Sequence, residues 1–332
     1  MTVTRGNDVK KYAEEICSKK EIKDVYFVAC GGSLASLYSP HYLLRCESAN
    51  VDSTLMNANE FVHATPARVN ENAVVITCSL SGTPETIEAT KVAKKLKATT
   101  IAISSNPNSP LFEYADYKFI EGRSGSEASD PDGKVDATTK GEALALRFCF
   151  ELLRIRDKYK NYKYAIEGFT MLDGICKRAE KKVRGLALKF GEEHKYDDTI
   201  YTMGSGALIS KAYSLSICIF MEMEWLHSFH IHTDEFFNGP FEMVERDRPF
   251  VIFMSAGKTR KMDERALKFL RRHCDRVTII DVMELGVSFI HQDVEEYFSA
   301  IVCNAMYTYA SALATCKCHP IPERRYMHKF EY

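Results

Sequence analysis

Side chains able to move protons are concentrated between Met203 and Glu242. Glu222 and Glu224 lie there in an apolar, helix-like run that ends before a group of histidines. Residues two apart do not share a helix face, so we expect one carboxylate to face solvent and the other to point inward. A carboxylate removed from water has a raised pKa, which suits it to proton transfer near neutral pH. The same spacing also fits the commoner case of a salt-bridged or surface glutamate.

Histidines follow this run at His227, His230 and His232, ahead of a Phe-Phe-Asn-Gly-Pro turn. Each of them, taken singly, is more often structural than catalytic. A metal pair made of His230 and His232 has little support from their spacing. The Cys-Lys-Cys-His segment that ends at His319 lacks a second ligand pair at a structural-zinc spacing. The sequence therefore predicts no metal site.

Two loops rich in glycine and hydroxyl side chains each come between a short apolar run and a helical stretch. Glycines allow close backbone approach, and free amides at a helix N-terminus attract an anion. Hydroxyls and amides without an obligatory lysine suit the phosphate of a small polyol, although serine and threonine also cap helices without any ligand. The candidate phosphate-binding residues are Gly31, Gly32, Ser33, Ser79, Ser81 and Thr83.

The glycine loops exclude two common nucleotide sites. No Gly-Lys-Ser/Thr follows the glycines of the first loop, so it is not a nucleotide P-loop. The Gly31-Gly32 pair lacks the third glycine of a dinucleotide fingerprint, which makes NAD an unlikely ligand. We expect no cofactor.

The elements that position these loops occur twice along the chain. Asp24–Ser36, Asn72–Lys95 and Thr99–Ser105 match Asp198–Ser210, Arg248–Arg272 and Arg276–Val282 in order and type. Short buried strands that alternate with helices predict βαβ units and a parallel sheet, and so large a period indicates domain duplication. We predict an N-terminal helix at 1–19, a first α/β domain at 20–160, a connecting helix at 161–189, a second domain at 190–312 and a tail at 313–332.

Composition places the chain among ordinary globular proteins. The net charge is −1 and the pI is near 6.8, so nothing attracts the chain to nucleic acid or to a membrane surface. No apolar run is long enough to span a bilayer, and the first 20 residues do not form a signal peptide. The 11 cysteines are scattered and many lie in apolar runs, which is typical of reduced thiols in the cytoplasm.

The paired loops, the duplication and the segment from Glu222 to Pro240 resemble the sugar isomerase (SIS) family. The chain is similar to the isomerase half of glucosamine-6-phosphate synthase. It is more similar to the deglycases that cleave phosphorylated Amadori compounds such as fructoselysine 6-phosphate and fructose-asparagine 6-phosphate. The segments that carry this closer resemblance are SICIFMEMEWLHS (216–228), DEFFNGPFE (234–242), DERALKFL (263–270) and ERRYMHKFEY (323–332). The resemblance implies two tandem SIS domains, each a flavodoxin-like three-layer αβα sandwich with a parallel sheet.

The resemblance also implies roles for individual residues. The hydroxyls of the two loops match positions that hold the sugar phosphate in this family, and the loop that contains Ser81 is one residue shorter than in its relatives. Glu222 matches the catalytic carboxylate, which implies that it is the buried one of the pair and lies against C1 and C2 of the substrate. His328 falls where a tail lysine assists ring opening in the synthase, and Lys329 follows it.

One position departs from the family. A histidine donated by the neighbouring subunit usually precedes Gly-Pro and is assigned to opening of the sugar ring, whereas this chain has Asn238. An amide does not titrate near neutral pH, so Asn238 cannot exchange that proton. Either Asn238 only orients the substrate while His230, His232 or His328 supplies the proton, or ring opening proceeds with little help, or the protein binds without catalysis.

The resemblance therefore implies a homodimer with shared active sites and a small phosphorylated sugar–amino acid substrate. A deglycase is the first hypothesis. An aldose–ketose isomerase of a sugar phosphate is the second, since the same carboxylate chemistry serves both. A non-catalytic phosphosugar-binding protein is the third.

Overall fold

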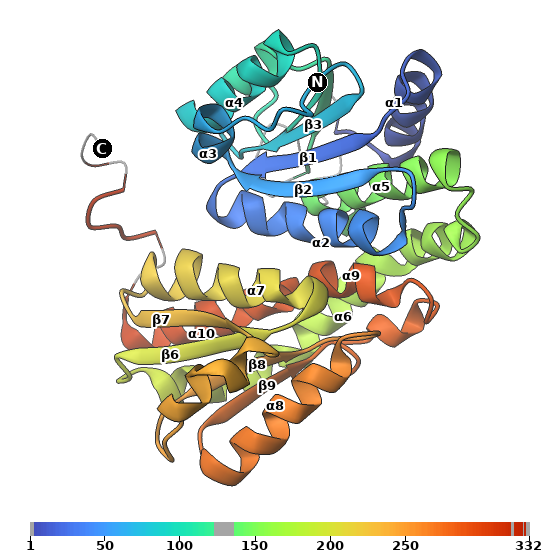
Figure 1. Cartoon of the computed structure of the whole chain (residues 1–332). Helices are drawn as coiled ribbons and strands as arrows, with labels where there is room; N and C mark the ends of the chain where they lie inside the picture. The colour runs from blue at the N-terminus through green and yellow to red at the C-terminus, as the bar shows by residue number, and fades with distance from the viewer. Residues whose placement is uncertain (1–2, 123–135, 320–321, 328, 330–332) are drawn as a thin grey trace. The chain divides into compact units, whose positions relative to one another are not determined.

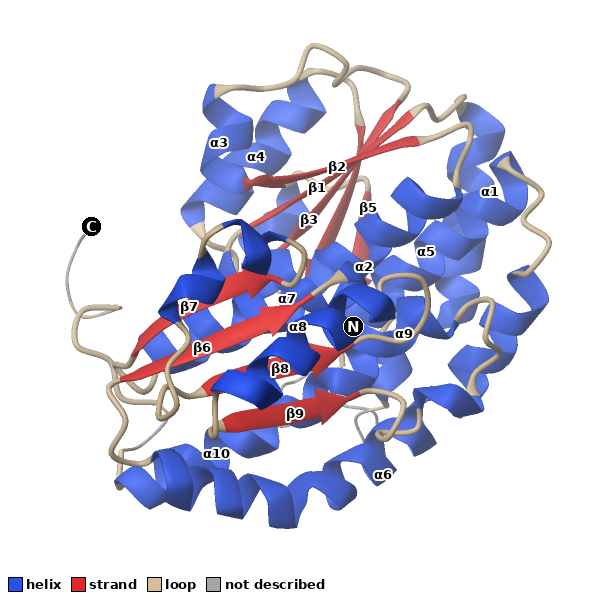
Figure 2. Cartoon of the chain, turned by 60° about the horizontal axis from the view of Figure 1, so that its bottom comes forward, coloured by secondary structure: helices blue, strands red, loops and turns tan. Residues whose placement is uncertain are grey.

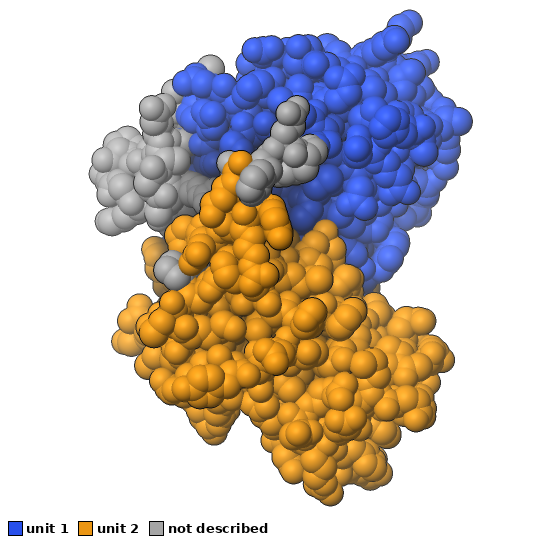
Figure 3. Space-filling model, turned by 90° about the vertical axis from the view of Figure 1, so that its left-hand side faces the viewer, with its two compact units in different colours: residues 1–173 blue, residues 174–332 orange. Residues whose placement is uncertain are grey.

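The computed structural model describes residues 3–122, 136–319, 322–327 and 329. The chain divides into two compact units, residues 1–173 and 174–332, which Figure 3 colours separately. Each unit is built on its own parallel sheet. Helix α6 (Tyr162–His194) contains the boundary between the units. The predicted domain limits of 20–160 and 190–312 stay a prediction.

The sheet of the first unit has five parallel strands in the order β2-β1-β3-β4-β5. Every residue of β1, β3 and β4 is buried, so both faces of the sheet must be covered. Figures 1 and 2 show α1, α2 and α5 on one face and α3 and α4 on the other. The bounds are α1 Gly6–Lys19, β1 Asp24–Ala29, α2 Gly31–Glu47, β2 Asp52–Asn57, α3 Ala58–His63, β3 Ala73–Cys78, α4 Pro84–Lys95, β4 Thr99–Ser104, β5 Tyr117–Ile120 and α5 Gly141–Arg156.

A buried carboxylate joins the last helices of the first unit. Glu151 of α5 is fully buried and accepts hydrogen bonds from Nε of Arg147 (2.9 Å), Nε of Arg154 (2.8 Å) and the hydroxyl of Tyr162 (2.6 Å). The two guanidinium groups and the hydroxyl compensate the desolvation of the carboxylate. Because Tyr162 begins α6, this cluster fixes the start of α6 against α5.

The sheet of the second unit has four parallel strands in the order β7-β6-β8-β9. Helix α8 packs on one face, over a core that includes Tyr201, Phe236 and Phe250. Figure 1 shows α7, α9, α10 and the second part of α6 on the other face. The bounds are β6 Thr199–Gly204, α7 Ile209–Tyr213, β7 His227–His232, β8 Phe250–Met254, α8 Arg260–His273, β9 Val277–Asp281, α9 Glu295–Val302 and α10 Tyr307–Lys317.

The two sheets confirm the predicted duplication. The order β7-β6-β8-β9 reproduces β2-β1-β3-β4, and a left-handed glycine follows β1 and β6 alike, at Gly31 and Gly206. The strand order of the first unit is that of flavodoxin-like folds. The predicted fold class, two tandem parallel-sheet αβα sandwiches, is confirmed. No helix among the described residues is long and apolar enough to cross a membrane.

Candidate active site

The two phosphate-loop candidates lie side by side in the first unit. The first follows β1 and the second follows β3, and these strands are neighbours in the sheet. Helices α2 and α4, which the loops open, cover opposite faces of the sheet. In parallel sheets, ligands bind at the carboxyl ends of the strands where the connections diverge in this way. All six candidate residues therefore lie at the one edge where an anion would bind.

The first loop presents the N-terminus of α2. The helix begins at Gly31, whose φ of 54° suits glycine, directly after the exposed Cys30. Ser33 hydrogen-bonds the thiol of Cys78, whose pKa burial raises to about 12, so that thiol stays protonated. Gly31, Gly32 and Ser33 are each at least partly exposed. The backbone amides of this turn are thus placed to meet an anion.

Ser79 organises the second loop. Its buried Oγ accepts hydrogen bonds from the amides of Gly82 (3.1 Å) and Thr83 (3.0 Å). Gly82 has a φ of 87°, which a residue with a side chain rarely adopts. The side chains of Ser81 and Thr83 are exposed, and Thr83 lies at the N-cap of α4. Ser79 therefore shapes the loop, while Ser81 and Thr83 carry the accessible hydroxyls.

The matching loops of the second unit are occupied by the chain's own carboxylates. Asp263 is fully buried, and its Oδ1 accepts hydrogen bonds from Ser205 (2.6 Å) and Thr233 (2.8 Å). Its Oδ2 accepts from the amide of Ser255 at 2.9 Å and from the Ser255 hydroxyl. Burial raises the pKa of Asp263, although these hydrogen bonds favour the ionised form. The hydroxyls at this edge of the second sheet are thus already used.

A second carboxylate fills the neighbouring loop. Glu296 of α9 lies against Gly257, where an added Cβ would come within 2.8 Å of its Oε2. Glu296 also accepts from the amide of Lys258 at 3.4 Å and pairs with its ammonium group at 3.4 Å. The candidate anion site is therefore confined to the loops of the first unit.

Glu222 lies where an irregular helix ends. The apolar segment Ser214–Met221 forms a π-helix after α7, and the chain then turns at Trp225, which has a φ of 55°. Glu222 is not the buried carboxylate of the pair, because its side chain is 25% exposed. Both Nε (2.9 Å) and Nη2 (2.8 Å) of Arg324 contact its Oε1.

Glu224 is the inward carboxylate. It is 2% exposed, and neither of its oxygens has a hydrogen-bond partner among the described residues. Burial raises the pKa of Glu224 to about 7, and the nearby charge of Lys317 opposes this shift. The family resemblance implied that Glu222 is the buried carboxylate, and the structure shows that Glu224 is.

The C-terminal segment packs on this turn. The His319 and Trp225 rings meet edge to face with centroids 4.2 Å apart. The Arg325 guanidinium lies 3.9 Å from the centre of the Trp225 ring. With the Arg324–Glu222 ion pair, the tail therefore contacts the turn at three points. His328 lies outside the described residues.

Asn238 is an exposed residue of a turn that a buried aromatic side chain anchors. It ends a 3-10 turn at Glu235–Asn238, and both Asn238 and Gly239 are exposed. Phe236 before it is fully buried and packs on Phe269 with ring centroids 5.7 Å apart. The side chain of Asn238 is therefore exposed on a turn that Phe236 anchors in the core. No contact among the described residues joins it to Glu222.

The histidines do not form a metal site. They lie on β7, the edge strand of the second sheet, with His227 and His230 exposed. His232 accepts a hydrogen bond from the amide of Asp234 at 3.2 Å. Within the ranges that the structure describes, no group of three histidine, cysteine, aspartate or glutamate residues could hold a metal ion.

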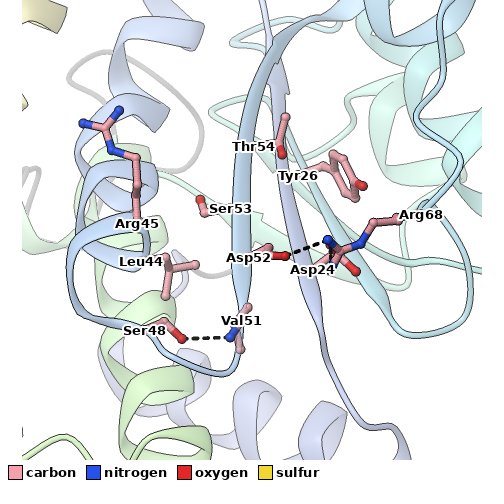
Figure 4. Close-up of a pocket in the computed structure, with 10 residues that line it drawn as sticks. All are labelled: Asp24, Tyr26, Leu44, Arg45, Ser48, Val51, Asp52, Ser53, Thr54 and Arg68. Atoms are coloured by element: carbon pink, nitrogen blue, oxygen red, sulfur yellow. Dashed lines mark hydrogen bonds and ion pairs between the residues drawn. The ribbon is translucent and has the colours of Figure 1, made fainter.

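A separate pocket of about 310 Å³ opens at the other end of the first sheet (Figure 4). Asp24 and Asp52, the first residues of β1 and β2, line it. Arg68 pairs with both, at 2.8 Å from Asp24 and 2.7 Å from Asp52. Because this pocket lies at the amino ends of the strands, it is not part of the candidate active site.

Comparison with known proteins supports this assignment of the fold. The SIS domain model matches residues 20–121, which contain both candidate phosphate loops. The chain is 36% identical to fructosamine deglycase FrlB of Bacillus subtilis (strain 168), over all of this chain and 99% of the relative. It is 26% identical to fructoselysine 6-phosphate deglycase of Escherichia coli (strain K12), over 93% of this chain and 86% of the relative.

A solved structure agrees over the full length. The crystal structure of a proposed phosphosugar isomerase from Salmonella typhimurium LT2 superimposes with a TM-score of 0.94, covering 100% of this chain and 98% of that one at 35% identity. The resemblance inferred from the loops and the duplication is thereby confirmed. The chain belongs to the SIS family, in the group of its deglycases and phosphosugar isomerases.

Proposed function

We propose that this protein is a deglycase that cleaves a phosphorylated Amadori compound, a fructosyl amino acid 6-phosphate, into glucose 6-phosphate and the free amino acid. The observation that carries the proposal is the 36% identity, over the whole chain, to a relative named a fructosamine deglycase. The open anion-binding edge of the first unit and the carboxylate Glu222 are the features that such a reaction needs.

The phosphate of the substrate would bind at the two loops of the first unit. Uncharged hydrogen-bond donors would hold it there. They are the amides of Gly31 and Gly32 at the start of α2 and the exposed hydroxyls of Ser81 and Thr83. Ser79 stabilises the second loop by accepting hydrogen bonds from two of its backbone amides. This arrangement suits a phosphate monoester dianion.

Glu222 would carry out the proton transfer. In the open-chain ketosamine, C1 bears the amine and C2 is a carbonyl. Glu222 removes a proton from C1, the electron pair forms the C1–C2 double bond, and the C2 oxygen gains a proton. Return of a proton to C2 then gives the aldimine at C1. One positioned general acid/base is sufficient for this transfer.

Hydrolysis completes the reaction. Water adds to C1 of the aldimine, and the C1–N bond breaks as the amine takes up a proton. The products are glucose 6-phosphate in its aldehyde form and the amino acid, and one water is consumed. C1 is oxidised and C2 is reduced by the same electron pair, so there is no net oxidation or reduction and the reaction requires neither nicotinamide nor a redox metal.

Asn238 would contact the substrate of a neighbouring subunit in a homodimer. Its exposure on a fixed turn supports this placement. The amide can orient the sugar by hydrogen bonds but cannot exchange a proton with the ring oxygen. Ring opening then depends on another group or on the spontaneous reaction.

A coupled assay tests the proposal. Fructose-aspartate 6-phosphate and fructoselysine 6-phosphate are each incubated with the protein, and glucose 6-phosphate is followed with its dehydrogenase while the released amino acid is quantified. Glu222→Gln should lower kcat by about 10² to 10⁴, and the exposed control Glu180→Gln should not. Asn238→His should raise kcat if ring opening limits turnover.

Two outcomes would contradict the deglycase. Conversion of fructose 6-phosphate to glucose 6-phosphate, without amine release from either conjugate, would establish the isomerase instead. Sugar-phosphate binding without turnover by the parent or by Asn238→His would indicate a non-catalytic binding protein.

A further inference from the structure

Arg324 occupies an unusual position for a residue beside a candidate general base. Its Nε and Nη2 contact the same oxygen of Glu222, Oε1, and its Nη1 donates to the carbonyl of Glu323 at 2.8 Å. Arg324 is 16% exposed on its side chain, and Glu222 is 25% exposed. The guanidinium occupies Oε1 of Glu222, so Arg324 must release this oxygen before it can take a proton from C1.

The chemistry of the substrate offers a way to change it. In a conjugate joined through an α-amine, the amino acid carboxylate lies three bonds from C1. A substrate that presents C1 to Glu222 therefore brings a second carboxylate within reach of the same guanidinium. An arginine and a carboxylate form two parallel hydrogen bonds when their planes align, which is a better arrangement than two contacts with one oxygen.

We propose that Arg324 binds the amino acid carboxylate of the substrate. In doing so it releases its ion pair with Glu222, which is then free to act as the base. This inference rests on the proposed function and adds a specificity-determining residue to it. The protein then discriminates for conjugates that carry a carboxylate near C1 and against simple sugar phosphates. In the absence of such a substrate, Glu222 stays paired.

The tail supplies Arg324 in a fixed place. Arg325, the next residue, lies on the Trp225 ring at 3.9 Å, and His319 meets the same ring from its edge. These contacts hold the tail on the turn without using the Arg324 guanidinium. The guanidinium can therefore change partners while the tail stays docked.

A matched pair of substrates isolates the carboxylate. Fructose-glycine 6-phosphate and fructose-methylamine 6-phosphate differ only by that group. The parent protein should favour the glycine compound in kcat/KM by about 100-fold. Arg324→Gln should bring this ratio close to one, mainly by lowering kcat/KM for the glycine compound. The control Arg246→Gln, which removes an exposed pair with Asp275, should keep the parent ratio.

A binding measurement tests the exchange independently of turnover. The dissociation constants of both compounds are measured from the fluorescence of Trp225, the single tryptophan of the chain. Glu222→Gln removes the competing carboxylate, so it should bind the glycine compound several-fold more tightly than the parent does. Arg324→Gln should bind the two compounds equally.

Three results would overturn the inference. An equal loss of kcat/KM for both compounds in Arg324→Gln would mean that Arg324 only positions Glu222. Equal affinity of the parent for both compounds would mean that no group reads the carboxylate. Binding of neither compound would refute both the inference and the deglycase.

The two proposals can also fail separately. Tighter binding of the glycine compound without release of glucose 6-phosphate would support the role of Arg324 and refute the deglycase.

Discussion

Glu224 gives the chain a dependence of stability on pH that Glu224→Gln should remove. Burial raises the pKa of Glu224 from its ordinary 4.5 to about 7. The unfolded chain therefore loses this proton from about pH 4.5 upward, while the folded chain keeps it until about pH 7. Glu224 therefore stabilises the fold most below about pH 4.5, where it is protonated in both states. This contribution declines as the pH rises and is lost above about pH 7, the pKa of Glu224 in the folded chain.

The size of this decline follows from the shift. A rise from 4.5 to about 7 corresponds to about 3 kcal/mol lost by pH 8. Glutamine is neutral throughout, so the stability of Glu224→Gln relative to the parent should increase by about 2 to 3 kcal/mol between about pH 5 and about pH 8. Most other groups titrate alike in both proteins and cancel in this comparison.

Trp225 makes the measurement local. As the single tryptophan, it lies beside Glu224 in the turn, so urea unfolding followed by tryptophan fluorescence reports on the second unit. The exposed Glu180→Gln should parallel the parent at every pH. Because the His319 ring contacts Trp225 and can influence its fluorescence, His319→Gln serves as a second control. A difference between parent and Glu224→Gln that does not change with pH would refute the reasoning.

Three further changes test the site and the buried carboxylates. Ser79→Ala removes the acceptor of two loop amides, so KM for the sugar phosphate should rise about tenfold with a smaller change in kcat, as steady-state kinetics will show. Asp263→Asn replaces one acceptor oxygen by an NH2 group that faces hydrogen-bond donors. It should therefore destabilise the second unit by about 3 kcal/mol in urea unfolding. Glu151→Gln leaves Arg147 and Arg154 without their buried anion and should lower the unfolding free energy of the first unit by about 3 kcal/mol, whereas an unchanged midpoint would contradict the role given to this cluster.

The sequence predicted the central strands and the edge strand β9, and it missed the edge strands β2 and β7. The strands β1, β3, β4, β6, β8 and β9 all coincide with the apolar runs that define the duplication. The edge strand β2 (DSTLMN) is only half buried, and β7 (HSFHIH) carries three histidines. A central strand of a parallel sheet is covered on both sides and must be apolar throughout, whereas an edge strand carries a weaker signal.

The side-chain geometry of the site depended on contacts that spacing does not encode. The spacing correctly predicted that Glu222 and Glu224 face opposite ways, but the resemblance placed the wrong one of the two inside. That assignment depends on a π-helix, on the left-handed turn at Trp225 and on a tail about 100 residues further along the chain. A pattern argument that assumes α-helical phase fails at such a turn.

Contacts of this kind also explain why only one half of a duplicated fold offers a candidate anion site. Both halves place a left-handed glycine after the first strand and serine after the next, so local sequence alone makes both edges equal candidates. In the second half Asp263 and Glu296 reach these loops from α8 and α9, and they take the hydroxyls and amides that an anion would need. A carboxylate already attached to the chain does not lose translational freedom on binding, so it outcompetes a free phosphate there. The first half keeps its loops open, so these loops remain the candidate anion site.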